Sequence, residues 1–413
     1  MAKNFANIFN STGDSSALEQ KIFIKEESAR GVLAIPTGTD ALLPEGGTSV
    51  NKSQTKRSST VKSGRHNTTL LKDKILTEWT INSLIHIDTT LGTPQAAEVD
   101  QAYKTLHKSM WGNESLVGGA IYNPTTPDIT FSIFENGDVM AKQTFGAFCE
   151  GMTINLPGDG DANMEVTGFA KNSLQVGIAR SVADNNGGND ITLDVAGDAD
   201  CFPVNAYVMI IKDDGLTRST DTPDGAPRQV TVSNNGTGVV TLSGAALADA
   251  DGSGAEIYLA YYEPETITVI NDPQTGLQGS VTIDNLVGVN CVQSVTITAV
   301  NNHTLYDGCY GEEGLGGPLF APGGRVDINV ELGLLLNAAF VKYLAGKEDF
   351  TPDDVDIVLG DATSRHLKID LPKVIYDFPA IEYPESGNVP VTMSGMAFQT
   401  ALDAEDELTI SYI

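Results

Sequence analysis

The stretch MEVTGFA at residues 164–170 has a counterpart 227 positions later, VTMSGMA at residues 391–397. In both stretches apolar residues stand at every second position up to a central glycine, which is typical of a β-strand with one buried face. The same shift places Ile154 on Ile381 and needs no gap over residues 145–170. We therefore expect related strands in the two halves of the chain, which is the sequence signature of an internal duplication.

The order of the predicted elements repeats as well. Each half contains a strand, an amphipathic helix ended by a glycine, and then several short strands. In the first half these are a strand at 79–87, a helix at 96–111 before Gly112, and strands at 129–134, 139–145, 148–154 and 164–170. In the second half they are a strand at 325–332, a helix at 334–345 before Gly346, and strands at 355–359, 366–371, 374–381 and 389–398.

Upstream of the gapless stretch the shift between the halves grows. Ile81-Asn82 falls on Ile328-Asn329, and the helix ends align at the two glycines. Loops of different length would produce such changes. The alternative is two unrelated β-rich domains that share a generic periodicity.

A segment rich in Asp, Asn and Gly separates the halves and has strand patterns of its own, at 191–195, 207–211, 229–232, 238–242 and 256–261. It is predicted to be a small β domain inserted at the surface, because the parent cores would close without it. The predicted organisation is an N-terminal arm at 1–25, a first β domain at 26–175, the insert at 176–263 and a second β domain at 264–413. The fold class is mainly β, of the α+β type, with one flanking helix in each repeated domain.

The net charge is −29, from 25 Lys and Arg against 54 Asp and Glu. Tight nucleic-acid binding is disfavoured, because it depends on cations that neutralise phosphates. An acidic surface past which DNA must slide would need this same sign, and simple solubility is the other explanation. The sequence shows neither a secretion signal nor an apolar stretch of the roughly 18 residues that span a bilayer, so assembly in a cytosol is expected.

Residues 44–74 have few apolar anchors and are predicted to form a long loop. Between Lys52 and Lys74 this loop carries seven basic residues and one acidic residue, Asp73. A nucleic-acid patch is disfavoured because no aromatic residues are interleaved. Docking on an acidic surface of the next identical subunit and a merely solvated loop are the remaining interpretations. The residues of this hypothetical stacking loop are Lys52, Lys56, Arg57, Lys62, Arg65, Lys72 and Lys74.

No catalytic or metal-binding constellation is recognisable, so we expect no enzyme, no metal and no cofactor. The five histidines lack metal-site spacing and are expected to be surface or strand residues. The four cysteines contain no C-x-x-C pair and are expected to be free, mostly buried thiols. DADGSG at 249–254 resembles part of a calcium loop, but its glycine is misplaced for that motif. LPGDGD at 156–161 is predicted to be a hairpin turn.

With these features the chain resembles the tail tube proteins of siphophages. The resemblance rests on the opening KEESARG at 25–31 with Pro36-Thr37, on the order of loop, strand, helix and strands, and on the closing VPVTMSGMAF at 389–398. It covers most of the chain outside about 176–263, and the insert is a departure from the simple family pattern.

The resemblance implies two tandem domains of the tail-tube type, each a β-sandwich or small barrel with a flanking helix. Six such domains form a ring whose inward strands close into a barrel around DNA, so a chain with two domains would form a homotrimer with pseudo-sixfold symmetry. Rings would stack into a tail tube, the conduit for DNA ejection, in a virion assembled in the host cytoplasm. Partners would be other copies and other tail proteins (tape measure, terminator, distal tail), with DNA passing through unbound and no membrane involved.

Two other classes are left open. A baseplate, tail terminator or decoration protein would use related β domains but form a single ring. A β-sandwich adhesin or carbohydrate-binding module would need a secretion signal and exposed aromatic platforms, and the chain has only two tryptophans, Trp79 and Trp111. The insert is expected on the outer wall of the tube, where it would meet host surfaces or carbohydrate.

Overall fold

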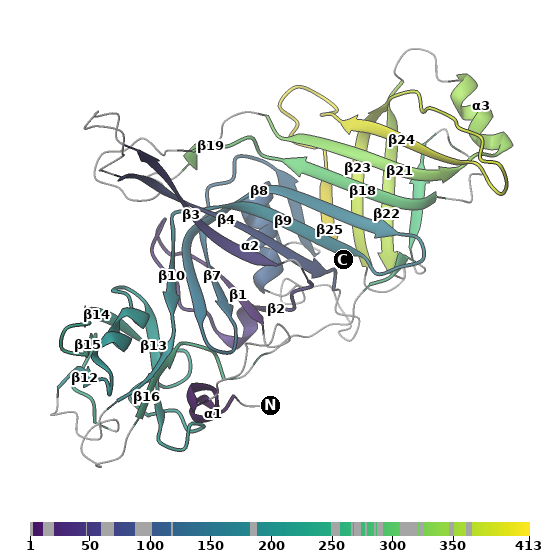
Figure 1. Cartoon of the computed structure of the whole chain (residues 1–413). Coiled ribbons are helices and arrows are strands. Elements are labelled where there is room, and N and C mark those ends of the chain that lie inside the picture. Colours follow the sequence, from purple (N-terminus) through teal and green to yellow (C-terminus); the bar gives the residue numbers. More distant parts are fainter. Residues whose placement is uncertain are drawn as a thin grey trace.

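The computed structural model describes residues 3–10, 20–46, 48–58, 70–86, 101–116, 119–181, 188–248, 257–265, 267, 274–276, 279–284, 286, 292–305, 320–321, 325–346, 351–360 and 366–413. The fold is mainly β and is built from antiparallel sheets (Figure 1). Within these residues no helix has the length and apolar character needed to cross a membrane.

The described residues of the first half form ten strands and the helix α2. Its elements are β1 (Lys21–Glu26), β2 (Ala41–Leu42), β3 (Ser49–Ser58), β4 (Leu70–Leu84), α2 (Gln101–Trp111), β5 (Gly112–Ser115), β6 (Ala120–Pro124), β7 (Phe131–Asn136), β8 (Ala141–Pro157), β9 (Asn163–Ala170) and β10 (Asn172–Val176). Gly112 has a φ of 81°, a left-handed value that glycine adopts without steric cost, and it ends α2 as expected.

The second half forms a second set of strands around the helix α3. Its elements are β17 (Ser280–Ile283), β18 (Val292–Val300), β19 (Thr304–Leu305), β20 (Phe320–Ala321), β21 (Asp327–Leu335), α3 (Ala338–Gly346), β22 (Asp353–Gly360), β23 (His366–Tyr376), β24 (Pro390–Ala397) and β25 (Thr409–Tyr412). Leu334 and Leu335 belong to β21 and not to the helix, so the predicted helix start at 334 was wrong; the alternating burial of β21 continues through these residues.

The two halves pair their strands in the same order. In the first half β1, β7, β8 and β10 are successive neighbours, and β8 continues into a second sheet with β9, β4 and β3. In the second half β17, β22, β23 and β25 repeat the first of these sheets, and β23, β24, β21 and β18 repeat the second. The two helices also come at equivalent places in the chain: α2 follows β4, and α3 follows β21, the counterpart of β4.

The residue registers agree with the gapless alignment at a shift of 227. Cys149 lies opposite Gly168, and Tyr376 lies opposite Gly395. Even an irregularity recurs. The register slips between Phe131 and Ile133 where β7 pairs with β8, and it slips between Asp353 and Val355 where β22 pairs with β23.

Two details of the sequence alignment were wrong. Trp79 lies opposite Gly168 and Val330 lies opposite Gly395, so β4 and β21 correspond at a shift of 251, four residues away from the match of Ile81 with Ile328. Similar apolar alternation along both strands allowed the slip, because a shift of four keeps the same face buried. The predicted strand at 374–381 also ends early, at Tyr376, which leaves Ile381 outside any strand.

One hydrophobic core runs through both halves. It contains alternate residues of the paired sheets, for example Ile81, Val166, Ile297 and Val330, together with the buried face of α2. The halves are joined by two strand pairs, β8 with β18 and β6 with β25. The halves therefore form one folded body, and the β6–β25 pair covers α2, which is why nearly the whole of that helix is buried.

The insert is a six-stranded sheet in the order β11-β16-β13-β14-β15-β12. These strands are β11 (Ile178–Arg180), β12 (Asp190–Thr192), β13 (Tyr207–Lys212), β14 (Arg228–Asn234), β15 (Val239–Leu242) and β16 (Ile257–Tyr261). Its two ends lie side by side, since the Tyr261 N–H donates to the Gly177 carbonyl at 3.2 Å. Figure 1 shows the insert at the end of the molecule away from the second half.

The core of the insert is not separate from the first half, which corrects the expectation of an independent surface module. Phe23 of β1, Phe134 of β7 and Ala141 of β8 are fully buried in the same cluster as the insert strands. On β1 the neighbours of Phe23, Ile22 and Ile24, point into the other core. Strand β1 therefore separates two cores, as the alternation of side chains across a strand allows.

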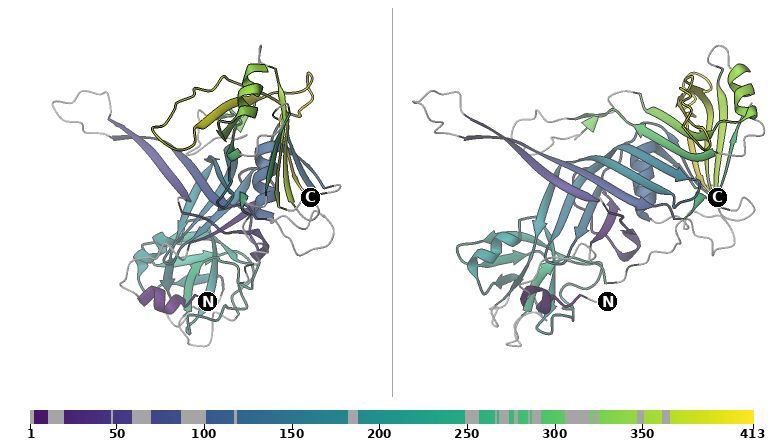
Figure 2. Two further views of the ribbon diagram at one scale, coloured as in Figure 1. Left: turned by 90° about the vertical axis from the view of Figure 1, so that its right-hand side faces the viewer. Right: turned by 45° about the vertical axis from the view of Figure 1, so that its right-hand side comes forward.

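Two segments predicted without regular structure are ordered here. Lys21–Glu26 is strand β1, and the short helix α1 (Phe5–Asn10) packs its Phe5 against Tyr261 of the insert, so the N-terminal arm is partly ordered on its own chain. The predicted long loop at 44–74 contains strands β3 and β4, which pair from Ser49 opposite Thr80 to Ser58 opposite Leu70. We call this hairpin the β3–β4 arm, and Figure 2 shows it projecting away from the body.

Candidate assembly surface

The sheets of the two halves join into one eight-stranded sheet in the order β3-β4-β9-β8-β18-β21-β24-β23. The joint is the antiparallel pair of β8 and β18, in which Ile154 lies opposite Ile297 and Asn155 lies opposite Thr296. Each half contributes four strands in equivalent order. The eight-stranded sheet is therefore two copies of one four-stranded unit placed edge to edge.

One face of this sheet covers the hydrophobic core, and the other is mostly polar but also carries Leu76, Phe169 and Met396. On β4, the side chains of Trp79 and Ile81 are buried in the core, whereas Glu78, next to Trp79 on the same strand, is exposed on the opposite face. The same alternation holds on the other strands. We define the polar face by Glu78, Thr80, Asn82, Thr153, Asn155, Glu165, Thr167, Thr296, Thr298, Asn329, Glu331, Thr392 and Ser394.

Short polar side chains form hydrogen bonds between strands of the polar face. Thr296 Oγ1 donates to Asn155 Oδ1 at 3.2 Å across the joint, and Asn155 Nδ2 donates to Asn163 Oδ1 at 3.0 Å. The charged residues among these positions are Glu78, Glu165 and Glu331, and one cation lies beside them, because the guanidinium carbon of Arg325 is 5.4 Å from the ring centre of Phe398 at the end of the face. On the second half a shallow groove of about 620 Å³ lies over this face, lined by residues that include Thr298, Glu331 and Ser394.

The eight-stranded sheet has two ends at which strand pairing stops. At one end β3 pairs only with β4 among the described residues. Lys142 Nζ donates to the Val50 carbonyl of β3 at 2.9 Å, so a side chain and not a strand bonds this edge group. At the other end β23 stops at Tyr376, and none of residues 377–389 belongs to a strand. Unpaired strand edges of this kind are templates for association with another chain.

Five of the seven basic residues of the predicted stacking loop lie on β3 and β4: Lys52, Lys56, Arg57, Lys72 and Lys74. Lys52 Nζ donates to the Ser173 carbonyl at 3.0 Å, which ties the base of the arm to β10. Lys56 lies opposite Lys72 in the register, and Arg57 lies opposite Leu71. Lys74 is on β4, and Lys62 and Arg65 lie outside the described residues.

Three aspartates cluster on the second half, and the sequence analysis did not predict this cluster. Asp354, Asp356 and Asp370 have carboxylate oxygens within 4.8 Å of one another, and Lys368 Nζ lies 2.8 Å from Asp356 Oδ1. Burial, followed by the charges of Asp370, Asp356 and Asp284, raises the pKa of Asp354. The equivalent positions of the first half, Ser132, Phe134 and Gln143, are uncharged and buried.

Most of the histidines and cysteines of the described chain are structural. His303 Nδ1 lies 2.7 Å from Glu150 Oε2, and His366 begins β23. Cys149 is buried, and burial raises the pKa of its thiol. Cys201 is also free but exposed. Residues 156–161 connect β8 to β9 as a hairpin turn, whereas His66, Cys291, Cys309 and 249–254 lie outside the described residues.

His107 was expected at the surface or on a strand, but it is buried in α2. Its Nδ1 accepts a hydrogen bond from Trp111 Nε1 at 3.2 Å, its Nε2 lies 2.8 Å from the Tyr412 hydroxyl, and its ring stacks on Tyr122. It therefore links α2 to β6 and to the C-terminal strand β25. Burial lowers the pKa of His107 to about 3.

This histidine predicts a pH dependence of stability. Below about pH 6.5 the unfolded chain protonates His107 while the folded chain does not, so the folded state loses about 1.4 kcal/mol per pH unit down to about pH 3. We expect His107→Gln to be less stable than the wild type at pH 7, and this difference to shrink by about 2 kcal/mol at pH 5. Urea unfolding of both proteins at several pH values measures it, and a gap that stays constant with pH would contradict the prediction.

Comparison with known proteins gave no assignment: no protein-family model and no curated protein sequence matched the chain.

Proposed function

We propose that this protein is the tail tube subunit of a long-tailed bacteriophage, a structural protein that forms rings and stacks them into a DNA conduit. The observation that carries the proposal is the eight-stranded sheet, in which two equivalent four-stranded units are joined edge to edge by β8 and β18. A unit that joins its own duplicate in this way, with an open edge at each end, suits a ring of further copies. In this proposal each half is one tube domain.

The dimensions of the sheet fit a ring of three chains. Three copies supply 24 strands, and strands about 4.8 Å apart give a circumference of about 115 Å and a diameter of about 37 Å. Strands tilted by about 35–45° would widen the barrel further. A barrel of this width, lined by short polar side chains, leaves room for a DNA duplex, and closure pairs every open edge.

The polar face supports the assignment of the sheet to the inner wall. The charged groups among the positions that define it are Glu78, Glu165 and Glu331, so carboxylates outnumber the one cation beside them, Arg325. Thr and Asn side chains that are hydrogen-bonded to each other have fewer free donors and acceptors with which to bind DNA as it passes. Such a wall repels the phosphate backbone and lets it slide, whereas tight binding would require Lys and Arg contacts.

The β3–β4 arm supplies the proposed contact between rings. It projects from the end of the sheet and carries Lys52, Lys56, Arg57, Lys72 and Lys74, whereas the rest of the chain has a large excess of Asp and Glu. Opposite potentials favour and orient association. In this proposal the arm of one ring lies on the acidic surface of the next ring.

Electron microscopy of the purified protein tests the proposal. The wild type should form hollow tubes of stacked rings with threefold symmetry, and a variant with Lys56, Arg57, Lys62 and Arg65 changed to Ser should form rings that do not stack. Wild-type rings that never stack would place the protein with the single-ring tail proteins. A protein that stays monomeric at every concentration would contradict the proposal.

A further inference from the structure

The joint between the two halves specifies how the open ends of the sheet meet. We propose that residues 380–384 form a strand along β3 of a second copy of this chain, with Ile381 opposite Val50 of that copy. This inference rests on the proposed function and names the segments and the register by which one chain binds the next. It follows from applying the internal equivalences to the β8–β18 pair.

The equivalence of β3 and β18 comes from the registers. Val50 lies opposite Trp79, and Trp79 lies opposite Gly168. In the second half Ile297 lies opposite Val330, and Val330 lies opposite Gly395. Because Gly168 corresponds to Gly395, Val50 corresponds to Ile297. The buried state of both side chains agrees with this assignment.

The equivalence of 378–384 with the end of β8 comes from the shift of 227. It places Ile154-Asn155-Leu156-Pro157 on Ile381-Glu382-Tyr383-Pro384, with the isoleucine and the proline retained. Residues 151–157 are strand and pair with β18, and residues 151–155 also pair with β9 on the other side. Residues 378–384 pair with no strand within the described chain and are not strand. In this inference the second copy supplies the counterpart of β18, and residues 380–384 become strand when they pair with it.

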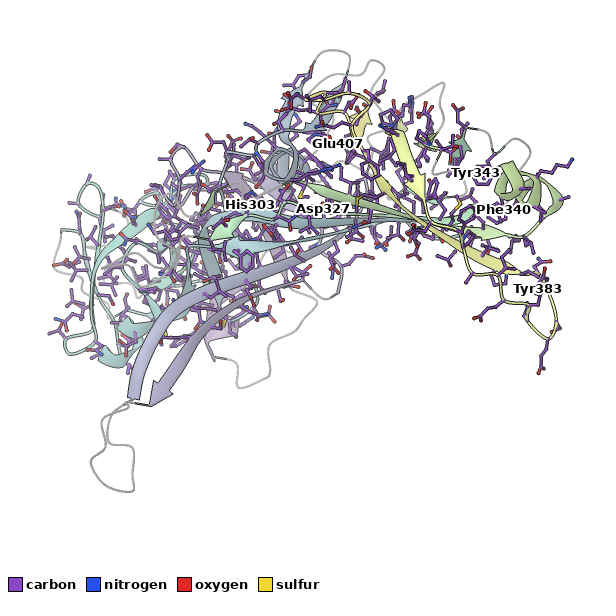
Figure 3. The ribbon with its side chains drawn as sticks, turned by 90° about the horizontal axis from the view of Figure 1, so that it is seen from above. His303, Asp327, Phe340, Tyr343, Tyr383 and Glu407 are labelled. Carbon is purple, nitrogen blue, oxygen red and sulfur yellow. The ribbon has the colours of Figure 1, made fainter. Side chains whose placement is uncertain are left out.

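Exposure and charge agree with a missing partner. Phe378 is 68% exposed and Tyr383 is 77% exposed. Two large aromatic side chains so exposed within one short segment are typical of an interaction surface. Figure 3 shows Tyr383 on a loop at the far end of the molecule from the β3–β4 arm. Residues 377–385 contain Asp377, Glu382 and Glu385 and no cation, whereas β3 carries Lys52, Lys56 and Arg57. The two edges are thus complementary in charge.

The hydrogen-bond pattern of the joint fixes which pairs lie closest. The Gly158 N–H donates to the Gln293 carbonyl at 2.7 Å and the Asn301 N–H donates to the Glu150 carbonyl at 2.8 Å, so even-numbered residues of β8 exchange the ladder bonds. Asn155 and Thr296 are therefore a non-hydrogen-bonded pair, and so are their counterparts Glu382 and Ser49. Such pairs have Cα atoms about 4.5 Å apart. Pro379 occupies the position equivalent to Met152, whose N–H would donate a ladder hydrogen bond. Because proline has no N–H, the proposed strand begins after Pro379.

Disulfide trapping tests the register. In a background without the four native cysteines, Ser49→Cys with Glu382→Cys should link chains during assembly, and the products should end at three chains on a non-reducing gel. Ser49→Cys with Ala380→Cys is the matched control on the same face, displaced by two residues, and should link at least tenfold less. Thr296→Cys with Asn155→Cys is the intrachain equivalent and should close within one chain, which shows that the method reports this geometry.

The outcomes separate the inference from the proposed function. Rings in which Ser49→Cys with Glu382→Cys links no better than the displaced pair would overturn the inference and leave the tube proposal intact. Trimers linked at Ser49 and Glu382 support the inference whether or not they stack into tubes. A chain that remains monomeric and unlinked, while the intrachain pair closes, would overturn both.

Discussion

Replacing Glu27 by alanine is expected to lower the free energy of unfolding by about 3–5 kcal/mol, the cost of leaving several buried donors without an acceptor. Its carboxylate accepts four hydrogen bonds. Thr130 Oγ1 and the Gly31 N–H donate to Oε2 at 2.6 and 2.7 Å, and Ser132 Oγ and the Gly146 N–H donate to Oε1 at 2.9 and 2.7 Å.

These bonds connect three parts of the first half. Gly31 lies in the turn after β1, Thr130 and Ser132 lie on or beside β7, and Gly146 lies where β8 passes from one sheet to the other. Gly146 has a φ of 64°, a conformation that few other residues adopt without strain. Glu27 therefore fixes the bend of β8, and through β8 it positions the joint with β18.

Urea unfolding measures this effect, with the neighbouring Glu26→Ala as the matched control. Glu26 is a partly exposed strand residue whose Oε2 lies 2.9 Å from Lys108 Nζ, and an exposed ion pair contributes about 0–1 kcal/mol. Glu27→Gln should be nearly as destabilising as Glu27→Ala, because its amide group would face donors that have no acceptor. Equal unfolding midpoints for Glu26→Ala and Glu27→Ala would refute this role.

The sequence analysis predicted the strands along which buried and exposed side chains alternate. It missed β3, whose strand conformation depends on pairing with a neighbouring strand. MEVTGFA and VTMSGMA are strands in which every second side chain points into the core. This alternation can be recognised from neighbouring residues in the sequence alone. Strand β3 of the arm consists mostly of Lys, Ser, Thr and Gln without such alternation, so this segment resembled a loop. The strands of the arm form through backbone pairing between residues such as Ser53 and Leu76, which no periodicity reveals.

The polar face of the eight-stranded sheet could not be predicted from the sequence for a similar reason. The acidic balance of the chain was visible, but the gathering of Glu78, Glu165 and Glu331 on one face depends on pairings between β4 and β9 and between β18 and β21. The pair of β8 with β18 joins residues about 140 positions apart. Glu27 was part of the KEESARG stretch, but its four donors come from three separate segments, so its role could not be read from spacing.

Deleting the insert is expected to leave an aggregating protein, and three further substitutions are expected to restore a soluble fold. The insert covers the outer sheet of the first half, where Phe23, Phe134 and Ala141 are fully buried. Removal of residues 178–260 would expose this surface, and each phenylalanine would lose about 1.5–3 kcal/mol of burial free energy. Gly177 and Tyr261 are hydrogen-bonded neighbours, so a short glycine link can close the gap.

The second half shows which residues suit an uncovered outer sheet. At the positions equivalent to Phe23, Phe134 and Ala141 it has Thr282, Asp356 and Lys368, all partly or fully exposed. These equivalences follow from the pairs Phe23 with Phe134 and Thr282 with Asp356, and from the shift of 227 along β8 and β23. Phe23→Thr, Phe134→Asp and Ala141→Lys should therefore convert the exposed face of the deletion variant into one that tolerates water.

Both deletion variants should also lack residues 1–10, because α1 packs on the strands that are removed. We expect the simple deletion to be mostly insoluble or to bind a hydrophobic dye, and the substituted deletion to be soluble and to unfold cooperatively. Since the eight-stranded sheet lies on the other side of the core, the substituted deletion should still form rings in the electron microscope. A simple deletion that folds as well as the substituted one would mean that the insert has a core of its own, and that Phe23 and Phe134 do not need its cover.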